Sequence, residues 1–349
     1  MFGLYRTCLA LAVVATHLLK VPVIGGYAVQ AFFILSGFLM TTIMNRNYGY
    51  SLKGVASFAV NRFLRLYPSY WVIVLLSVGV IMFWGEGSVR AYHSAIYLPA
   101  SPTEWLQNLS LVYTNTIPMY VSPRLAPPTW ALTVELLFYM LIALGLSRGK
   151  KLTCLWFFVS ILYIIYVYIS GLDPSYRYLH VLSGSLPFSI GAMAYHYGDQ
   201  IKNVSQRYST QGWLLAFSMI FLMNSVLAAL AIHVWSAPVV VLLCFYANIC
   251  INFGIIAILI NRPKLPISAA FDKKIGDYSY PLYLCHWQAG FVASMLLFGR
   301  PERGPSLYGG FAFLLALIIS GMVSYVTIRY VDHPIERLRS KIRAKSKVG

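Results

Sequence analysis

The sequence has few charged residues. Only 11% of its 349 residues are Asp, Glu, Lys or Arg, whereas 59% belong to the apolar set. Soluble domains carry about 25% charged residues, so this composition excludes an ordinary soluble protein. It also excludes a disordered chain or a coiled coil, because both need polar or charge-rich sequences. The composition predicts a protein that crosses a membrane several times.

The sequence also lacks the cysteine spacing of a disulfide framework or a metal site. Its five cysteines fall inside apolar runs, form no CxxC pair and make no cluster with histidines at metal-ligand spacing. We interpret them as small buried apolar side chains. We therefore expect no bound metal and no permanently bound cofactor.

Long apolar runs are abundant. About 20 apolar residues in a row cross the hydrocarbon layer of a bilayer, which is roughly 30 Å thick. Such runs occur near residues 4–20, 27–45, 67–84, 130–147, 152–170, 179–198, 212–230, 234–260, 279–298 and 308–331. They predict an all-α, polytopic membrane bundle of about ten transmembrane helices. We expect a single domain over residues 1–349, in which 332–349 form a basic cytoplasmic tail.

Basic residues are unevenly distributed between the two sides of these helices. The chain has 27 Lys and Arg against 10 Asp and Glu, a net charge of +17. With a cytoplasmic N-terminus, the inner loops and the tail hold 19 basic residues and the outer loops hold 6. This ratio follows the positive-inside rule, so both termini are predicted to face the cytoplasm. Topology and contact with anionic lipids explain the positive charge, and no nucleic-acid partner is expected.

One outer loop, from about residue 85 to residue 129, is too long for a simple connector. It is rich in Pro, Tyr and Trp. Long loops often act as lids or binding surfaces, so one interpretation is an acceptor-binding surface. The other is an ordinary amphipathic loop at the membrane interface. The sequence leaves both open.

Ionisable residues inside the apolar runs are candidates for function, because a charge at mid-bilayer costs about 2.5–3.5 kcal/mol. Arg6 and His17 are eleven residues apart on the first helix, close to three turns, so they share a face about 16 Å apart along the axis. Each also has a structural explanation. Arg6 can be an anchor at the inner surface, and His17 an interface histidine.

Glu135 has the same expected depth as His17. A carboxylate and an imidazole at one level favour pairing, and the carboxylate would fix the imidazole tautomer as a general base requires. The alternative is a glutamate held by helix-packing hydrogen bonds. His286 is expected nearer the inner side than His17, as a binding or structural residue. Arg62 and Arg65 are one turn apart and suit either membrane anchoring or bidentate phosphate binding.

Several segments together carry a family resemblance. They are the Arg-x10-His spacing of Arg6 and His17, AFFILSGFLM (31–40), NRFLRLYPSYW (61–71), TWALTVELLFY (129–139) and GDYSYPLYLCHW (276–287). In this order they resemble the acyltransferase-3 family, bacterial integral membrane enzymes that acylate glycans of the cell envelope.

The resemblance implies an O-acyltransferase of the bacterial inner membrane. It would move an acyl group, usually acetyl, from cytoplasmic acyl-CoA to a hydroxyl of a glycan or lipid-linked glycan, such as lipopolysaccharide O-antigen or exopolysaccharide. The residues it implies are His17 and Glu135 for catalysis, Arg6, Arg62 and Arg65 for CoA binding, and Trp130, Tyr139, Ser279, Tyr283 and His286 for substrate binding.

Three questions stay open in the sequence. His17 can act as a general base or carry the acyl group itself. Ser36 is a conceivable nucleophile, but its position beside Gly37 is better explained by close helix packing. The alternative function, from a different class, is a transporter of an acyl donor or of an envelope glycan.

Overall fold

The computed structural model describes residues 2–205, 210–261 and 267–345, and within these ranges it contains helices and no β-strand. The all-α prediction is confirmed. Each of the ten predicted runs contains a helix: α1 (Gly3–Leu19), α2 (Ile24–Ile43), α3 (Leu52–Trp84), α6 (Trp130–Ala143), α7 (Lys150–Ile169), α8 (Ser185–His196), α10 (Thr210–His233), α11 (Pro238–Ile260), α12 (Ala269–Phe298) and α13 (Leu307–Thr327). Of the basic residues counted above, Arg207, Arg262, Lys264 and Lys347 lie outside the described residues.

The chain is a multi-pass membrane protein. Within the described residues, six helices are long and apolar enough to cross a bilayer by length and composition. They are Ile24–Tyr48, Leu52–Trp84, Lys150–Ile169, Gln211–His233, Pro238–Ile260 and Leu307–Ala344. The helices Gly3–Leu19 and Pro127–Ala143 are apolar but shorter. The count of ten spans and the direction of the termini therefore stay predictions.

Some helices begin at residues that hydropathy does not identify. The third helix was predicted from residue 67, but α3 starts at Leu52, where Ser51 accepts a hydrogen bond from the backbone N–H of Gly54. Likewise α12 starts at Ala269 instead of residue 279, capped by Ser268. The predicted tail is also a helix. A π-helical turn, Ile328–Asp332, joins α13 to α14 (His333–Lys345).

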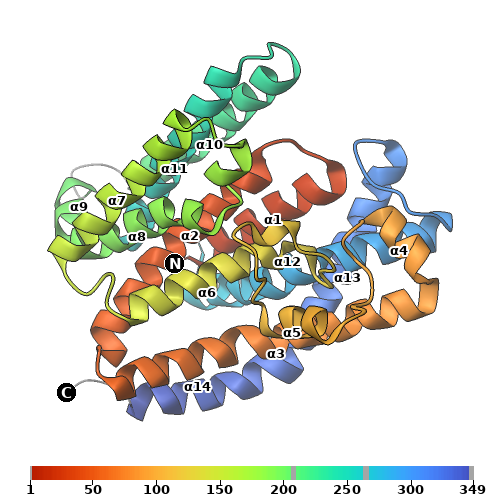
Figure 1. Ribbon diagram of the computed structural model, residues 1–349, viewed down its shortest axis with the longest axis horizontal. Coiled ribbons are helices and arrows are strands. Elements are labelled where there is room, and N and C mark those ends of the chain that lie inside the picture. The colour runs from red at the N-terminus through yellow and green to blue at the C-terminus, as the bar shows by residue number, and fades with distance from the viewer. Residues whose placement is uncertain (1, 206–209, 262–266, 346–349) are drawn as a thin grey trace.

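Helices α1, α2 and α12 pack side by side in the middle of the bundle (Figure 1). Along one edge of the bundle α14 runs beside α3, and the α10–α11 pair projects from the opposite edge. The start of α1 is fixed to the start of α12, because the backbone N–H groups of Gly3 and Leu4 donate to Asp272 at 3.1 and 3.0 Å. A carboxylate at a helix N-terminus satisfies free N–H groups and opposes the helix dipole.

The long loop is a folded part of the bundle. It contains α4 (Glu86–Tyr92), α5 (Pro102–Ser110) and two short 3-10 turns, Pro118–Tyr120 and Pro127–Thr129. Arg124 is buried within it and donates to the backbone carbonyls of Met119, Val121 and Pro127. The loop packs against the bundle, because Ser77 of α3 and Gln288 of α12 both donate to the Leu125 carbonyl, and it covers the end of the bundle at which α3 ends (Figure 1).

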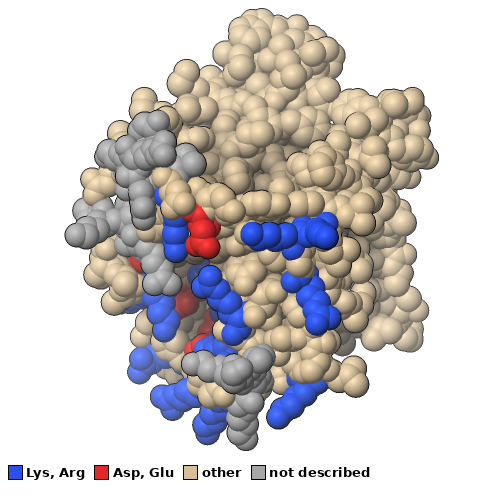
Figure 2. Space-filling model, turned by 90° about the vertical axis from the view of Figure 1, so that its left-hand side faces the viewer, with Lys and Arg blue, Asp and Glu red and all other residues tan. Residues whose placement is uncertain are grey.

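Lysine and arginine gather at the other end of the bundle. Figure 2 shows this end with many basic and few acidic side chains. Figure 1 places at this end the π-helical turn η1 (Met44–Tyr48), the start of α3 and the connection from α6 to α7. These segments carry Arg46, Lys53, Arg148, Lys150 and Lys151. We call this end the basic face, and the end covered by the long loop the opposite face.

Helices α2 and α8 approach each other closely through two glycines. A Cβ atom at Gly191 would collide with the carbonyl oxygen of Ile34, and one at Gly37 would collide with the carbonyl oxygen of Phe188. Small residues allow helix backbones in a membrane to come this close. The packing interpretation of the segment around Ser36 and Gly37 therefore holds for Gly37.

Substituting Gly191 with valine should destabilise the fold by about 3 kcal/mol or more, because the new side chain meets backbone atoms that have no rotamer with which to yield. Thermal unfolding of the purified protein in detergent measures the effect. Gly79→Val is the matched control, since a Cβ atom at Gly79 meets nothing within 4 Å. Equal unfolding temperatures for the two variants would contradict the predicted contact.

Candidate active site

A cavity lies toward the basic face between α1, α2, α3, α6 and α12. Three of its lining residues are arginines, Arg6, Arg62 and Arg65, and we call it the arginine pocket. Its other polar lining residues are Ser36, Glu135, Tyr139, Ser279, Tyr280 and Tyr283. The fold thus brings together seven of the ten residues that the sequence singled out. His17, His286 and Trp130 do not line it.

The arginines of the pocket keep N–H donors free for a ligand. Arg6 Nη2 donates to the carbonyl of Gly276 at 3.1 Å, and Arg62 Nη2 donates to the side chain of Asn61 at 3.0 Å. The Nε atoms of Arg6 and Arg62 are buried and have no hydrogen-bond partner. A buried donor without a partner is costly, so an anion with several acceptor oxygens would stabilise the pocket.

Glu135 belongs to this pocket and does not pair directly with His17. Ser36 Oγ donates to one carboxylate oxygen at 2.7 Å, and the Tyr139 hydroxyl donates to the other at 3.1 Å. The predicted direct pair is wrong, because depth fixes a position along α6 but not the direction in which the side chain points. A catalytic role for Glu135 stays a prediction. The interpretation of Ser36 as a helix-packing residue did not predict its hydrogen bond to Glu135.

His17 pairs with His286. His17 Nδ1 and His286 Nε2 are 2.8 Å apart, and the two rings stack with centroids 5.0 Å apart. His286 was expected nearer the inner side than His17, which is wrong. Because α12 begins at Ala269, His286 lies 17 residues along it, about 26 Å from its start.

The hydrogen bonds around the pair fix the positions of its protons. His286 Nδ1 lies 2.7 Å from the carbonyl oxygen of Tyr283, which only accepts, so this nitrogen carries a hydrogen. In a neutral imidazole the other nitrogen, Nε2, is then an acceptor, and His17 Nδ1 donates to it. His17 Nε2 is left with a free lone pair. The pair therefore presents one unprotonated imidazole nitrogen as a base.

Three further side chains surround the pair toward the opposite face. The Trp287 ring stacks on His17 with centroids 5.0 Å apart, and the Arg303 guanidinium lies 4.9 Å from the Trp287 centroid. Arg303 Nη1 also donates to the His17 carbonyl at 3.3 Å. The His93 ring meets Trp287 edge-on at 4.2 Å. Burial, with Arg124 and Arg303 nearby, lowers the pKa of His93 to about 3, so this imidazole is neutral.

Sequence reasoning missed these neighbours. His93 and Arg303 come from loops, more than 70 residues from His17 in the chain, and neither lies in an apolar run. No local pattern marks them. Trp287 directly follows His286 in GDYSYPLYLCHW (276–287), one of the segments that carry the family resemblance, and this position was the one available signal.

A comparison with protein families decides the class. A family described as an acyltransferase domain matches residues 3–325, nearly the whole chain. The chain belongs to the acyltransferase-3 family. No curated protein and no solved structure matches it. Membership indicates a membrane acyltransferase, and the matched residues include both histidines and the arginine pocket.

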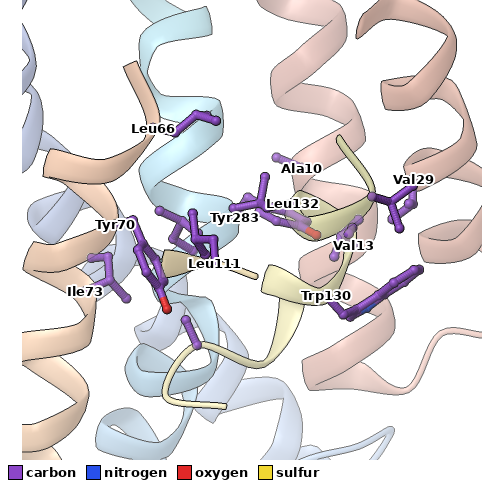
Figure 3. Close-up of a cluster of buried hydrophobic side chains, with 14 of the residues drawn as sticks. Ala10, Val13, Val29, Leu66, Tyr70, Ile73, Leu111, Trp130, Leu132 and Tyr283 are labelled. Atoms are coloured by element: carbon purple, nitrogen blue, oxygen red, sulfur yellow. The ribbon is translucent and has the colours of Figure 1, made fainter. Parts of the chain in front are cut away.

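In this acyltransferase, Tyr283 joins the two parts of the site. It lines the arginine pocket, and its carbonyl contacts His286 one turn further along α12. Its hydroxyl donates to the carbonyl of Pro128 at 2.8 Å. Figure 3 shows Tyr283 among buried apolar side chains that include Val13 and Leu132. One helical turn thus separates the arginine pocket from the histidine pair.

Trp130 is buried against Tyr178, with ring centroids 5.4 Å apart, and not in the arginine pocket. A substrate-binding role for Trp130 therefore stays a prediction. Within the described ranges no group of three or more His, Cys, Asp or Glu side chains is arranged to hold a metal ion.

Proposed function

We propose that the protein is a membrane O-acyltransferase that moves an acyl group, acetyl by default, from cytoplasmic acyl-CoA to a hydroxyl of an envelope glycan. The basic face would lie in the cytoplasm of a bacterial cell, with both termini there and ten helices spanning the inner membrane. The acceptor would be a glycan or lipid-linked glycan, such as lipopolysaccharide O-antigen or exopolysaccharide, presented at the opposite face.

The observation that carries this proposal is the layout of α1. Arg6, near its start, lines the arginine pocket, and His17, near its end, pairs with His286. Eleven residues at 1.5 Å rise separate them by about 16 Å. Donor phosphates bound by Arg6, Arg62 and Arg65 would let the pantetheine arm extend along α1 toward His17. A donor from one side of the membrane would then meet an acceptor from the other.

The chemistry follows from the free nitrogen of His17. As the acceptor hydroxyl attacks the thioester carbonyl, His17 Nε2 takes its proton. The new C–O bond forms, the C–S bond breaks, and the imidazolium returns the proton to the departing thiolate. His286 accepts the Nδ1–H bond throughout, which keeps Nε2 in the basic tautomer and disperses the charge of the imidazolium.

Reconstituted liposomes test this function. With labelled acetyl-CoA on the side of the basic face and a glycan acceptor on the other, we expect labelled ester on the acceptor. Donor supplied only on the opposite face should give none, because the phosphate-binding arginines lie toward the basic face. Unmodified glycan or intact donor crossing the membrane without new ester would support the transporter alternative.

A further inference from the structure

The C-terminal segment beyond the family match packs against α3, one of the helices that line the arginine pocket. The match ends at residue 325, whereas the chain continues through the π-helical turn Ile328–Asp332 into α14. This last helix runs beside α3, the helix that carries Arg62 and Arg65 (Figure 1). The tail was predicted only as a basic cytoplasmic extension, so its contacts with α3 give it a role that charge alone does not explain.

The central contact is between Arg339 of α14 and Asn61 of α3, and both residues are buried. Arg339 Nε and Nη2 donate to Asn61 Oδ1 at 3.3 and 3.2 Å, and Asn61 Nδ2 donates back to the Arg339 carbonyl at 3.2 Å. A planar guanidinium meeting an amide at several points fixes the orientation of that amide.

Asn61 in turn holds Arg62. The same Oδ1 atom accepts a hydrogen bond from Arg62 Nη2 at 3.0 Å. Within the described residues Arg62 makes no ion pair with a carboxylate. Its other contacts are a weak hydrogen bond to the sulfur of Met40 at 3.6 Å and the ring of Phe58, whose centroid lies 5.8 Å away. Asn61 is therefore the main polar group that directs the Arg62 side chain.

Each of the three guanidinium nitrogens of Arg339 has a partner in the protein, and Arg339 does not line the arginine pocket. Its third nitrogen, Nη1, donates to Glu336, which also pairs with Arg343. The carboxylate of Glu336 offsets the repulsion between Arg339 and Arg62, which share one oxygen atom. A second contact also joins the C-terminal segment to an arginine of the pocket. Asp332 lies 3.8 Å from Arg65 and accepts a hydrogen bond from Ser69.

We propose that Arg339 is a positioning residue for the acyl donor, and that it fixes the Arg62 guanidinium through Asn61 so that Arg62 can bind the donor's phosphate groups. The proposal rests on the proposed function, in which the arginine pocket holds the phosphates of CoA. On this proposal, donor binding depends on α14, which lies beyond the residues that the family matches.

The test is a double-mutant cycle on CoA binding, measured by calorimetry with the purified full-length protein in detergent. Arg339→Gln should weaken CoA binding by about tenfold, the scale of losing a hydrogen bond to a charged group. It should raise KM for acetyl-CoA equally and leave kcat unchanged. Added to Arg62→Ala, the same substitution should cause no further loss, because Arg339 acts through Arg62.

Arg337→Gln is the matched control. It removes the same charge from the same helix at an exposed position, and it should leave CoA binding unchanged. If Arg339→Gln does not yield folded protein, Arg339→Lys replaces it, because lysine keeps the charge but not the planar contact. Arg339→Lys should weaken CoA binding by less than tenfold, and it should cause no further loss when added to Arg62→Ala.

Two results would overturn the proposal while leaving the proposed function intact. One is an Arg339 variant that binds CoA as well as the Arg337 control does. The other is an effect of Arg339→Gln that multiplies fully with that of Arg62→Ala. If the unaltered protein transfers no acyl group and does not bind CoA, the proposed function itself fails.

Discussion

Replacing His17 with alanine is expected to lower acyl transfer about a thousandfold. A positioned general base contributes roughly 10²–10⁴ in rate, and the imidazole that remains, His286, lies on the far side of the His17 ring from the nitrogen that acts as the base. His286 has its Nδ1 hydrogen committed to the carbonyl of Tyr283 and its Nε2 directed at His17. Initial rates with labelled acetyl-CoA and a glycan acceptor measure the loss.

CoA binding provides the control for this variant. The arginine pocket does not include His17, so His17→Ala should bind CoA as the unaltered protein does. A variant that keeps more than a tenth of the activity would remove His17 from the mechanism. Mass spectrometry of acid-quenched protein distinguishes the two chemistries, because an acyl-histidine intermediate adds the acyl mass to His17 whereas a general base adds none.

Replacing His286 with alanine is expected to lower kcat about a hundredfold. Without Nε2 of His286, the His17 proton is free to move to either ring nitrogen, and only one tautomer is the base. The imidazolium that forms during transfer would also lose its hydrogen-bond acceptor. Steady-state kinetics at saturating acetyl-CoA isolate this loss from any effect on donor binding.

Glu135→Gln is the informative comparison for His286→Ala. Glutamine keeps the size of Glu135 and an oxygen that can accept from Ser36 or Tyr139, so the pocket should retain its shape. We expect it to lower kcat less than His286→Ala does. The reverse order would mean that the carboxylate, as the sequence suggested, orients His17 during the reaction.

Hydropathy predicted where the apolar helices lie, and the helical period of α1 predicted that Arg6 and His17 share a face. Both depend on properties within one helix. The His17–His286 pair depends on where α12 starts, and that start lies in a charged segment around Asp272, outside the apolar run. Hydropathy reports the apolar part of a helix and not its caps, so the depth assigned to His286 was wrong.

Glu135 shows a second limit of the sequence. Its depth along α6 was estimated from its distance to the helix start, but its partner depends on the rotation of α6 against α2. That rotation is set by packing between helices about 100 residues apart in the chain, as the bond from Ser36 to Glu135 shows. A single sequence carries no signal for such contacts, and the same holds for His93 and Arg303.

The contacts of α14 bear on how this protein can be shortened or joined to others. A chain ended at residue 325 would keep both histidines and all three pocket arginines, yet it would lose Asp332 and Arg339. Asn61 would then keep only one of its four hydrogen bonds, the one from Arg62. Fusion partners and affinity tags therefore belong after α14, and the boundary of a family match is a poor guide to where this enzyme can be cut.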